Sequence, residues 1–173
     1  MNKSIFITGV AGSGKSVVCD ELNKLGYKAY GIEDIAGLFK IVDKTGKQAE
    51  NYDNDNLESI KQADWICDKN KLQRLMRKNS EGIVFYCGTA SNLDDLLTLF
   101  DKIFLLNVSQ KVLRERLSPR SSTDFGRTHE VQRWIFSWKK WWEDHMREKG
   151  AVIINANRSL REIVNDIVDR SKS

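Results

Sequence analysis

The chain has 173 residues, 40% of them hydrophobic, so it is long enough to bury one full core and falls within the size range of a single domain. Its 28 basic and 24 acidic residues leave a net charge of only +4, which indicates a mixed surface and does not require a nucleic-acid partner. The sequence enters a strand almost at once and holds no apolar run of membrane-spanning length, so we expect a cytoplasmic protein with neither a signal peptide nor a transmembrane helix.

The first predicted strand, residues 5–7, runs directly into the motif G-x-x-x-x-G-K-S at residues 9–16. Glycines let such a loop turn tightly and point its N–H groups inward, and the helix that follows adds its positive N-terminal end. We expect Lys15 to reach the β- and γ-phosphates of ATP, and the Ser16 hydroxyl to ligate Mg²⁺. The residues predicted to bind phosphate are Gly9, Ala11, Gly12, Ser13, Gly14, Lys15, Ser16 and Val17.

Apolar residues recur at helical spacing over residues 18–25, and Gly26 stands where a left-handed C-terminal cap is expected. The strands are continuous apolar runs, which is typical of strands buried on both faces of a parallel sheet. These runs, of which the second is the weakest, are residues 5–7, 28–30, 83–86, 103–106 and 152–154.

Two polar segments interrupt this alternation. Residues 43–64, here called the flap, are rich in turn-forming residues, so we expect an exposed segment that is followed by a helix ending near Lys78. Residues 118–128, here called the lid, contain the only proline of the chain, two arginines and several small polar residues. Both segments are candidates for parts that close over a bound substrate.

Helices are expected between the later strands, over residues 93–100 and over residues 112–117 after Ser109 as N-cap. Ser159 followed by Glu162 forms a capping box at the start of the last helix. Strands that alternate with helices predict a three-layer α/β domain with a central parallel sheet of about five strands.

Four of the five tryptophans lie in one predicted helix after the lid. Trp134, Trp138 and Trp141 fall with His145 at helical spacing, and Trp142 flanks them. We favour an apolar stripe that packs this helix onto the sheet, while stacking on nucleic-acid bases is the alternative that the neighbouring basic residues leave open.

Neither the cysteines nor the histidines have the spacing of a metal site. The three cysteines, Cys19, Cys67 and Cys87, are widely separated and include no CxxC pair, so we expect reduced, buried thiols. His129 and His145 are each isolated and are interpreted as surface or helix-end residues.

The phosphate loop, the flap, the arginine-bearing lid and residues 153–158 before the last helix occur in the order found in the small P-loop kinases, a family that this chain resembles. The adenylate, shikimate and gluconate kinases belong to that family. The resemblance implies an ATP- and Mg²⁺-dependent transfer of phosphate. It covers nearly the whole chain in order, although only the phosphate loop is specific by itself.

Further binding residues follow from the resemblance. Arg116 and Arg120 look like the family's arginine pair at the start of the lid, and with Arg127 closing from the far side they would meet the γ-phosphate. Asn155, Ala156 and Arg158 match the loop that lies against adenine, where Arg158 would stack on the base. The alternatives are a solvated basic helix end and a plain strand-to-helix turn.

The acids after the second strand depart from the family pattern. Shikimate-type members carry Asp-x-Asp there, whereas this chain reads Gly31-Ile32-Glu33-Asp34, so the first acid looks replaced by Gly31. Either Glu33 or Asp34 is then a candidate to accept the proton of the acceptor hydroxyl. The alternative is that both acids merely stabilise a helix N-terminus.

The strand at residues 83–86 leads into Cys87-Gly88-Thr89, without the Asp that many P-loop proteins place there to hold Mg²⁺. The same stretch lacks the arginine with which nucleoside monophosphate kinases grip the acceptor phosphate, although Arg74, Arg77 or Lys40 can supply such a grip.

The leading hypothesis from the sequence is a kinase of a small-molecule hydroxyl, nucleoside-like acceptors included. The rivals are a nucleoside monophosphate kinase and an ATP-binding switch or RNA-associated ATPase. We expect a monomer or a homodimer.

Overall fold

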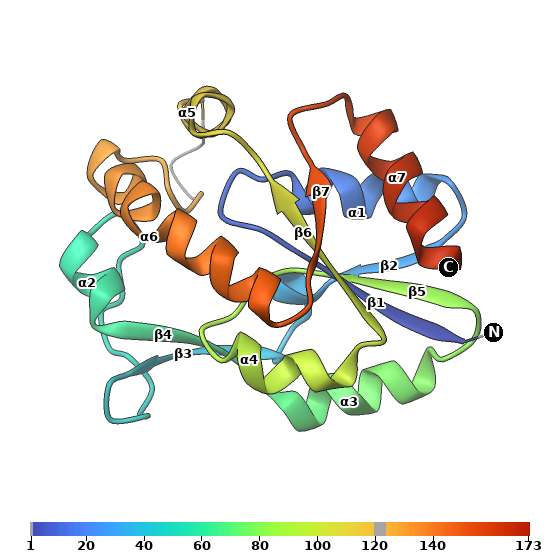
Figure 1. Ribbon diagram of the computed structural model, residues 1–173. Coiled ribbons are helices and arrows are strands. Elements are labelled where there is room, and N and C mark those ends of the chain that lie inside the picture. Colours follow the sequence, from blue (N-terminus) through green and yellow to red (C-terminus); the bar gives the residue numbers. More distant parts are fainter. Residues whose placement is uncertain (1, 120–123) are drawn as a thin grey trace.

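A computed structural model describes residues 2–119 and 124–173 of the chain (Figure 1). A parallel sheet of five strands in the order β2-β5-β1-β6-β7 forms its centre. These strands are β1 (Lys3–Thr8), β2 (Lys28–Gly31), β5 (Ile83–Cys87), β6 (Lys102–Asn107) and β7 (Val152–Asn155). Each predicted apolar run lies in one of them, so the predicted three-layer fold is confirmed.

Helices cover both faces of the sheet (Figure 1). On one face lie α1 (Lys15–Lys24) and α7 (Leu160–Lys172), and on the other α3 (Lys69–Lys78) and α4 (Leu93–Leu96) with the 3-10 helix η2 (Leu97–Leu99). Alternate strand residues join opposite cores: Ile5 and Ile7 pack with α1 and α7, while Phe6 packs with α3 and α4. Because both faces are covered, the strands carry apolar residues without interruption.

The sequence signals at helix ends are also confirmed. Gly26 follows α1 with a φ of 87°, a left-handed conformation that glycine adopts without strain. Ser109 caps α5 (Gln110–Leu117) by accepting a hydrogen bond from the Val112 N–H, and Ser159 forms the expected capping box with Glu162.

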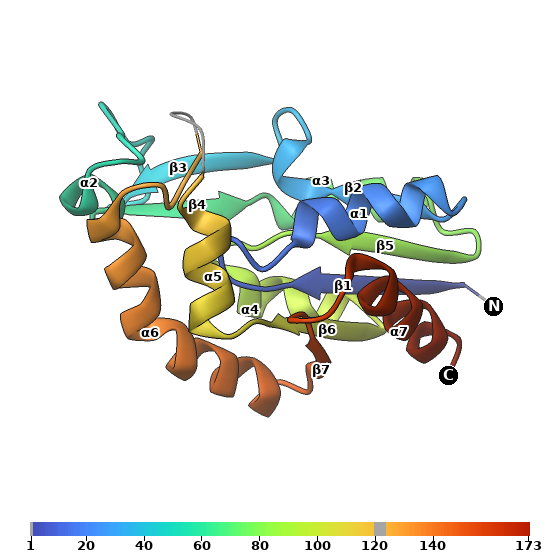
Figure 2. The ribbon, with the colours of Figure 1, turned by 90° about the horizontal axis from the view of Figure 1, so that it is seen from above.

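The flap differs from the expectation. It is framed by an antiparallel pair, β3 (Phe39–Asp43) and β4 (Ala63–Cys67), and contains the short helix α2 (Leu57–Lys61). The prediction of one helix from the flap to Lys78 was wrong in its first part, because residues 63–67 pair with β3 and Asp68 caps the helix that begins at Lys69. In Figures 1 and 2 the β3–β4 pair, α2 and α6 (His129–Glu148) lie at the end of the molecule away from the chain termini.

The tryptophans of α6 divide differently from the prediction. Trp134, Trp138 and Trp142 pack against the buried core, whereas Trp141 is 69% exposed and stacks on the ring of His145. Residues four apart stay on one face of a helix, and Trp141 falls outside this series. The core interpretation therefore holds for Trp142 and not for Trp141. None of the helices in the described ranges is long and apolar enough to cross a membrane.

Candidate active site

The loop between β1 and α1 has the backbone shape that a phosphate-binding loop requires. Gly12 and Gly14 have φ values of 82° and 103°, a region that side chains rarely allow. The Lys15 Nζ donates to the carbonyl oxygens of Gly9 and Val10 at 2.7 and 3.1 Å. The lysine amine thus lies over the mouth of its own loop, where the phosphates of a nucleotide would be bound.

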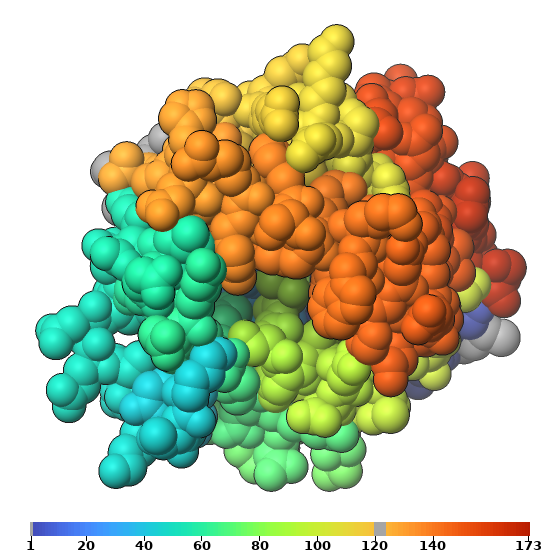
Figure 3. All heavy atoms as spheres, turned by 60° about the vertical axis from the view of Figure 1, so that its left-hand side comes forward, coloured from blue at the N-terminus to red at the C-terminus, as the bar shows by residue number. Residues whose placement is uncertain are grey.

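The loop opens into a cavity of about 1090 Å³, and Figure 3 shows a hollow between the orange α6 and the green and teal segments facing it. The phosphate loop, η1 (Ile32–Asp34), the flap, the residues after β5, α6 and the start of α7 all contribute to its wall. Pockets for one small ligand usually measure about 300–1,000 Å³. The cavity is thus at the upper end of the size range of ligand sites.

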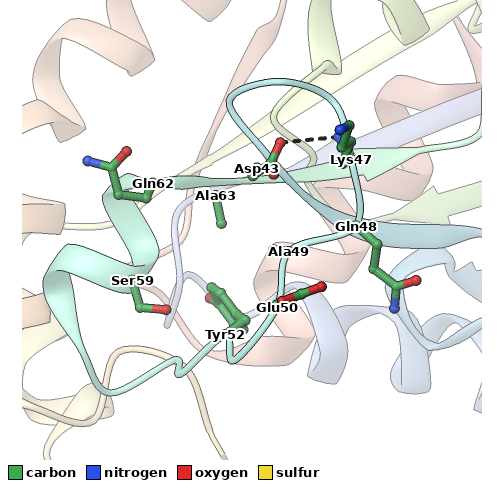
Figure 4. A pocket seen from close by; sticks show the side chains of 9 residues that line it. All are labelled: Asp43, Lys47, Gln48, Ala49, Glu50, Tyr52, Ser59, Gln62 and Ala63. Carbon is green, nitrogen blue, oxygen red and sulfur yellow. Dashed lines mark hydrogen bonds between the residues drawn. The ribbon is translucent and has the colours of Figure 1, made fainter.

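A smaller hollow of about 420 Å³ lies within the flap (Figure 4). The turn beside it is closed by the Lys47 backbone N–H, which donates to Asp43 Oδ1 at 3.2 Å. Tyr52 and Ala63 line both this hollow and the larger cavity. The two hollows therefore meet at these two residues of the flap.

Glu33 lines the large cavity and is partly buried in η1, directly after β2. The Trp65 Nε1 donates a hydrogen bond to Glu33 Oε1 at 3.2 Å. Burial raises the pKa of Glu33, while the positive charge of Lys15 and hydrogen bonds from Trp65 and the Thr89 backbone oppose the rise. A carboxyl group with a raised pKa beside the phosphate-loop lysine has the properties of a proton acceptor in catalysis.

Asp34 has different surroundings from its neighbour. It is exposed, and a Cβ atom added at Gly31 would lie only 2.8 Å from Asp34 Oδ2. The Asp34 carboxyl therefore fills the space that a side chain at position 31 would need. A side chain at position 31 would have to displace the end of the exposed Asp34 side chain, so a carboxylate lies beside the position where the family's first acid was expected.

The missing aspartate after β5 has a steric explanation. A Cβ atom added at Gly88 would lie 2.6 Å from Ile32 Cγ1 and 3.4 Å from Glu33 Cγ. Ile32 is fully buried, so it has no room to yield. The η1 turn thus fills the space at the end of β5, and no side chain fits at position 88.

Replacing Gly88 with alanine is therefore expected to displace η1, to lower stability by about 1–3 kcal/mol and to reduce turnover with little loss of ATP binding. Thermal unfolding and ATP titration of the variant check this. Wild-type stability together with wild-type turnover would show that the turn has room to spare and that the steric explanation is wrong.

Arg116 joins the phosphate loop to the loop after β7. Its Nη1 donates to the Ser13 carbonyl at 3.2 Å and its Nη2 to the Ala156 carbonyl at 3.0 Å. The Ala156 N–H in turn donates to the Asn107 carbonyl at 2.8 Å. Arg116 lines the cavity, but with these two contacts it braces the nucleotide side of the site.

Arg158 lies at the edge of the same cavity and is held in place on two sides. Its Nε donates to the Asn155 carbonyl at 2.9 Å, and its Nη2 donates to Asp166 Oδ2 at 2.7 Å. Asn155 Oδ1 accepts from the Asn157 N–H at 3.0 Å, which fixes the turn. A guanidinium fixed in this way can offer its flat face to a base.

The lid arginines are not gathered around the phosphate loop in the described residues. Arg127 is absent from the cavity wall and pairs instead with Asp55 of the flap, to which its Nε donates at 3.0 Å. Arg120 lies outside the described residues. The two histidines are also away from the site: His145 pairs with Asp94 at 2.9 Å, and His129 begins α6.

The donor atoms near the phosphate loop fit Mg²⁺. The Ser16 hydroxyl and the Asp34 carboxylate line the cavity and are hard oxygen ligands, which Mg²⁺ prefers. The described residues contain no group of three acidic, histidine or cysteine side chains that could hold a metal ion. One or two protein oxygens are the usual contribution to Mg²⁺ at a nucleotide site, where phosphate oxygens and water supply the other ligands.

Sequence reasoning missed Trp65, which holds the carboxylate of Glu33 and stacks on Phe39 at 4.9 Å. Residues 63–67 read Ala-Asp-Trp-Ile-Cys and come directly before Asp68, a residue type that often caps helices. This cap signal, with an aromatic and a β-branched residue before it, would have separated a strand from the following helix.

Comparison with known proteins agrees with the fold and the loop. Residues 5–135 match the family AAA_18, described as an AAA domain, and the chain belongs to this family. No curated protein matches the chain in sequence. The predicted resemblance to the small P-loop kinases is confirmed.

Three solved structures illustrate the shared fold. A deoxyadenosine kinase from M. mycoides with the products dCMP and a flexible dCDP bound is 18% identical, with a TM-score of 0.57 over 96% of this chain and 97% of that chain. The same enzyme with dATP bound gives 18% identity and a TM-score of 0.55 over 98% and 100%. A gluconokinase from Sinorhizobium meliloti 1021 is 22% identical, with a TM-score of 0.51 over 94% and 87%.

Proposed function

We propose that the protein is an ATP- and Mg²⁺-dependent kinase that transfers the γ-phosphate of ATP to a hydroxyl group of a small molecule. The observation that carries this proposal is the carboxyl of Glu33, which lines the same cavity as the phosphate loop and feels the charge of Lys15. A kinase needs this combination, because a hydroxyl group must be oriented and deprotonated beside a bound triphosphate. The kinases of similar fold support the same class.

In the proposed reaction, the acceptor oxygen attacks the γ-phosphorus in line, the bond to the β-phosphate oxygen breaks and ADP leaves. Lys15 and the N-terminal end of α1 stabilise the charge on the phosphates. Glu33 accepts the hydroxyl proton, and Trp65 holds the Glu33 carboxylate toward the cavity. Mg²⁺, bound by Ser16 and reached through water by Asp34, would screen the phosphate oxygens.

The nucleotide base is proposed to lie between the start of α7 and the loop after β7. Arg158, Leu160 and Ile163 line the cavity there, which offers a flat cation and two apolar side chains. The Ala156 carbonyl accepts from Arg116 and the Ala156 N–H donates to the Asn107 carbonyl, so neither group is left for the base. The contact with the base therefore depends on the three side chains of the cavity wall. This arrangement supports ATP as the phosphate donor.

A nucleoside monophosphate acceptor is less well supported. Its phosphate needs a cation away from the phosphate loop, and the candidates Lys40, Arg74 and Arg77 are exposed and do not line the cavity. Arg127 is paired with Asp55. Among the described residues, the cations that line the cavity are Lys15, Arg116 and Arg158, all on the nucleotide side. A neutral hydroxyl acceptor fits these charges better.

The proposal takes residues 1–173 as one kinase domain, with the flap at residues 43–64 and the lid at residues 118–128. It includes Arg120 and Arg127 as residues that reach the γ-phosphate when the lid closes. The three cysteines are free and buried, which supports the predicted cytoplasmic location. We expect a monomer or a homodimer.

The proposal is tested by measuring ADP formation from ATP and Mg²⁺ with and without candidate acceptors. A neutral acceptor should stimulate ADP formation strongly above the slow hydrolysis of ATP by water. Slow hydrolysis that no nucleoside, monophosphate or sugar acid accelerates would instead favour an ATP-dependent switch.

The pH dependence offers a check on Glu33. The hydrogen bond from Trp65 lowers the pKa of Glu33 and so opposes the rise caused by burial. Replacing Trp65 with phenylalanine removes this bond, and the pKa of Glu33 should therefore rise further. Because Glu33 must be ionised to accept a proton, activity is lost as the pH falls through its pKa, and the acidic limb of the profile should move to higher pH. The profile of kcat against pH measures this shift.

Trp141→Phe is the matched control, since Trp141 is 69% exposed and does not line the cavity that Glu33 lines. Its acidic limb should coincide with that of the wild type. An unchanged acidic limb in Trp65→Phe would show that Glu33 does not set the pH dependence of the reaction.

A further inference from the structure

The strand β4, which carries Trp65, has different partners at its two edges. One edge pairs with β3, and these two strands form a sheet of their own, separate from the central sheet. A pair of strands by itself is only marginally stable in water. The position of Trp65 relative to the central sheet therefore depends on what holds the other edge of β4.

The loop after β5 holds that edge. The Ser91 N–H donates to the Trp65 carbonyl at 2.7 Å, and the Trp65 N–H donates to Ser91 Oγ at 2.8 Å. The Cys67 N–H donates to Asn92 Oδ1 at 3.0 Å, and Asn92 Nδ2 donates to the Cys67 carbonyl at 2.9 Å. Ser91 and Asn92 thus bond to the backbone of two alternate residues of β4, as a neighbouring strand would.

Asn92 uses its side chain for this contact and not for its own helix. It is the N-cap residue of α4, a position where an asparagine side chain usually accepts a hydrogen bond from the first turn of the helix. Here both polar atoms of the side chain bond to Cys67, which is only 1% exposed. Because a buried backbone group without a partner costs free energy, Asn92 cannot turn toward its helix without unpairing Cys67.

The same loop also reaches the carboxyl of Glu33 directly. The backbone of Thr89 donates a hydrogen bond to Glu33, and the Trp65 Nε1 donates to Glu33 Oε1 at 3.2 Å. Thr89 precedes Ser91 by two residues, and Ser91 is bonded to the Trp65 backbone. The two groups that donate to Glu33 are therefore positioned by one short stretch of chain.

Resting on the proposed kinase function, in which Glu33 accepts the hydroxyl proton, we propose that Asn92 is a positioning residue for the reaction. Its side chain fixes β4 against the loop after β5, β4 presents the indole N–H of Trp65, and this N–H holds the Glu33 carboxylate toward the acceptor. Asn92 acts through Trp65 and without touching a substrate, since it is not among the described residues that line the large cavity.

Asn23 provides a matched control, because its side chain forms the same pair of bonds at another strand. Asn23 Nδ2 donates to the Ala29 carbonyl at 2.8 Å, and the Ala29 N–H donates to Asn23 Oδ1 at 3.2 Å. Ala29 belongs to β2, which β5 already holds in the central sheet. Neither residue belongs to the wall of the large cavity as the described part of the chain forms it.

The first measurement is made without substrates, on the indole N–H resonance of Trp65 in protein labelled with ¹⁵N-tryptophan. The resonance is assigned by its loss in Trp65→Phe. In Asn92→Ala it should shift, and its hydrogen exchange with water should become about 2–10-fold faster, which corresponds to the loss of one hydrogen bond. In Asn23→Ala the resonance and its exchange rate should match those of the wild type.

The second measurement is turnover with the acceptor. Asn92→Ala should lower kcat about 2–10-fold and keep the KM for ATP within about twofold, because the proton acceptor is displaced and the nucleotide side is not. Added to Trp65→Phe, the same change should alter kcat little, since the residue through which Asn92 acts has already lost its N–H. Asn23→Ala should keep the kcat of the wild type.

Thermal unfolding shows whether the variants are folded. If Asn92→Ala does not fold, Ser91→Ala takes its place, because it removes only the acceptor of the Trp65 backbone N–H. The same changes of the Trp65 resonance and of kcat are expected for it. An unchanged Trp65 resonance, equal changes in Asn23→Ala, or an undiminished fall of kcat on the Trp65→Phe background would each overturn the inference.

The two measurements separate this inference from the proposed function. Acceptor phosphorylation that depends on Glu33, together with a Trp65 resonance that Asn92→Ala leaves unchanged, would contradict the inference alone. A Trp65 resonance that depends on Asn92, in a wild-type protein that phosphorylates no acceptor, would contradict the proposed function and leave the link from Asn92 to Glu33 in place.

Discussion

Lys15→Ala is expected to lower ATP-dependent turnover by at least about 10²–10³-fold, the usual cost of removing one donor that stabilises charge in the transition state. The Lys15 amine lies over the phosphate loop, 2.7 Å from the Gly9 carbonyl oxygen, and no other described lysine lines the cavity. The variant should also bind ATP much more weakly. ATP titration and steady-state turnover measure the two effects separately.

Lys24→Ala is the matched control, because Lys24 is in the same helix, is 72% exposed and pairs only with Glu21 among the described residues. Its turnover should equal that of the wild type. The thermal stability of Lys15→Ala should also stay close to that of the wild type, since the lysine projects from a loop. Normal turnover of Lys15→Ala would show that the nucleotide does not bind at the phosphate loop.

Glu33→Gln should reduce acceptor-dependent turnover by roughly 10²–10⁴-fold, which is the range for loss of a general base, and leave ATP affinity nearly unchanged. The amide keeps the shape of the side chain and can still accept from the Trp65 N–H, but it cannot take a proton. Single-turnover measurements with saturating ATP and acceptor would isolate this step.

Asp34→Asn is the natural comparison, since Asp34 is the adjacent acid and its carboxyl lies over Gly31. Its effect should be smaller and should appear mainly as a higher Mg²⁺ requirement. Should both variants keep full turnover with the true acceptor, the acids of η1 would serve only the local structure of this turn.

The phosphate loop and the sheet were predictable because their signals are local. The Gly-x-x-x-x-Gly-Lys-Ser motif fixes a backbone shape within eight residues, and glycines at positions 12 and 14 do have positive φ values. The buried strands are continuous apolar runs, and the Ser159–Glu162 capping box marks a helix start within four residues. None of these signals depends on a distant part of the chain.

The β3–β4 pair and the role of Trp65 were not predictable in the same way. Residues 39–43 and 63–67 are short, and they become strands by pairing with each other across the polar flap. The bond from Trp65 to Glu33 joins residues 32 positions apart. Contacts of this kind depend on the assembled fold and leave little trace in local periodicity.

The roles of the two acids also needed the structure. The sequence shows that Gly31 stands where an acid was expected, but not that the Asp34 carboxyl fills the space beside it. Likewise, helical spacing alone grouped Trp141 with Trp134 and Trp138, whereas in the structure Trp142 packs against the core with them and Trp141 is exposed. A difference of one position on a helix turns a side chain by about 100°, which is enough to exchange core for solvent.

The central claim, that this protein transfers phosphate to a small-molecule hydroxyl, is tested most directly by following the label from γ-³²P-ATP in the presence of Mg²⁺ and a panel of nucleosides, nucleoside monophosphates and sugar acids. We expect the label in an acid-stable phosphate ester of a neutral acceptor, and we expect Lys15→Ala and Glu33→Gln to form far less of this product. Label found only in inorganic phosphate, at the same rate with and without every acceptor, would contradict it.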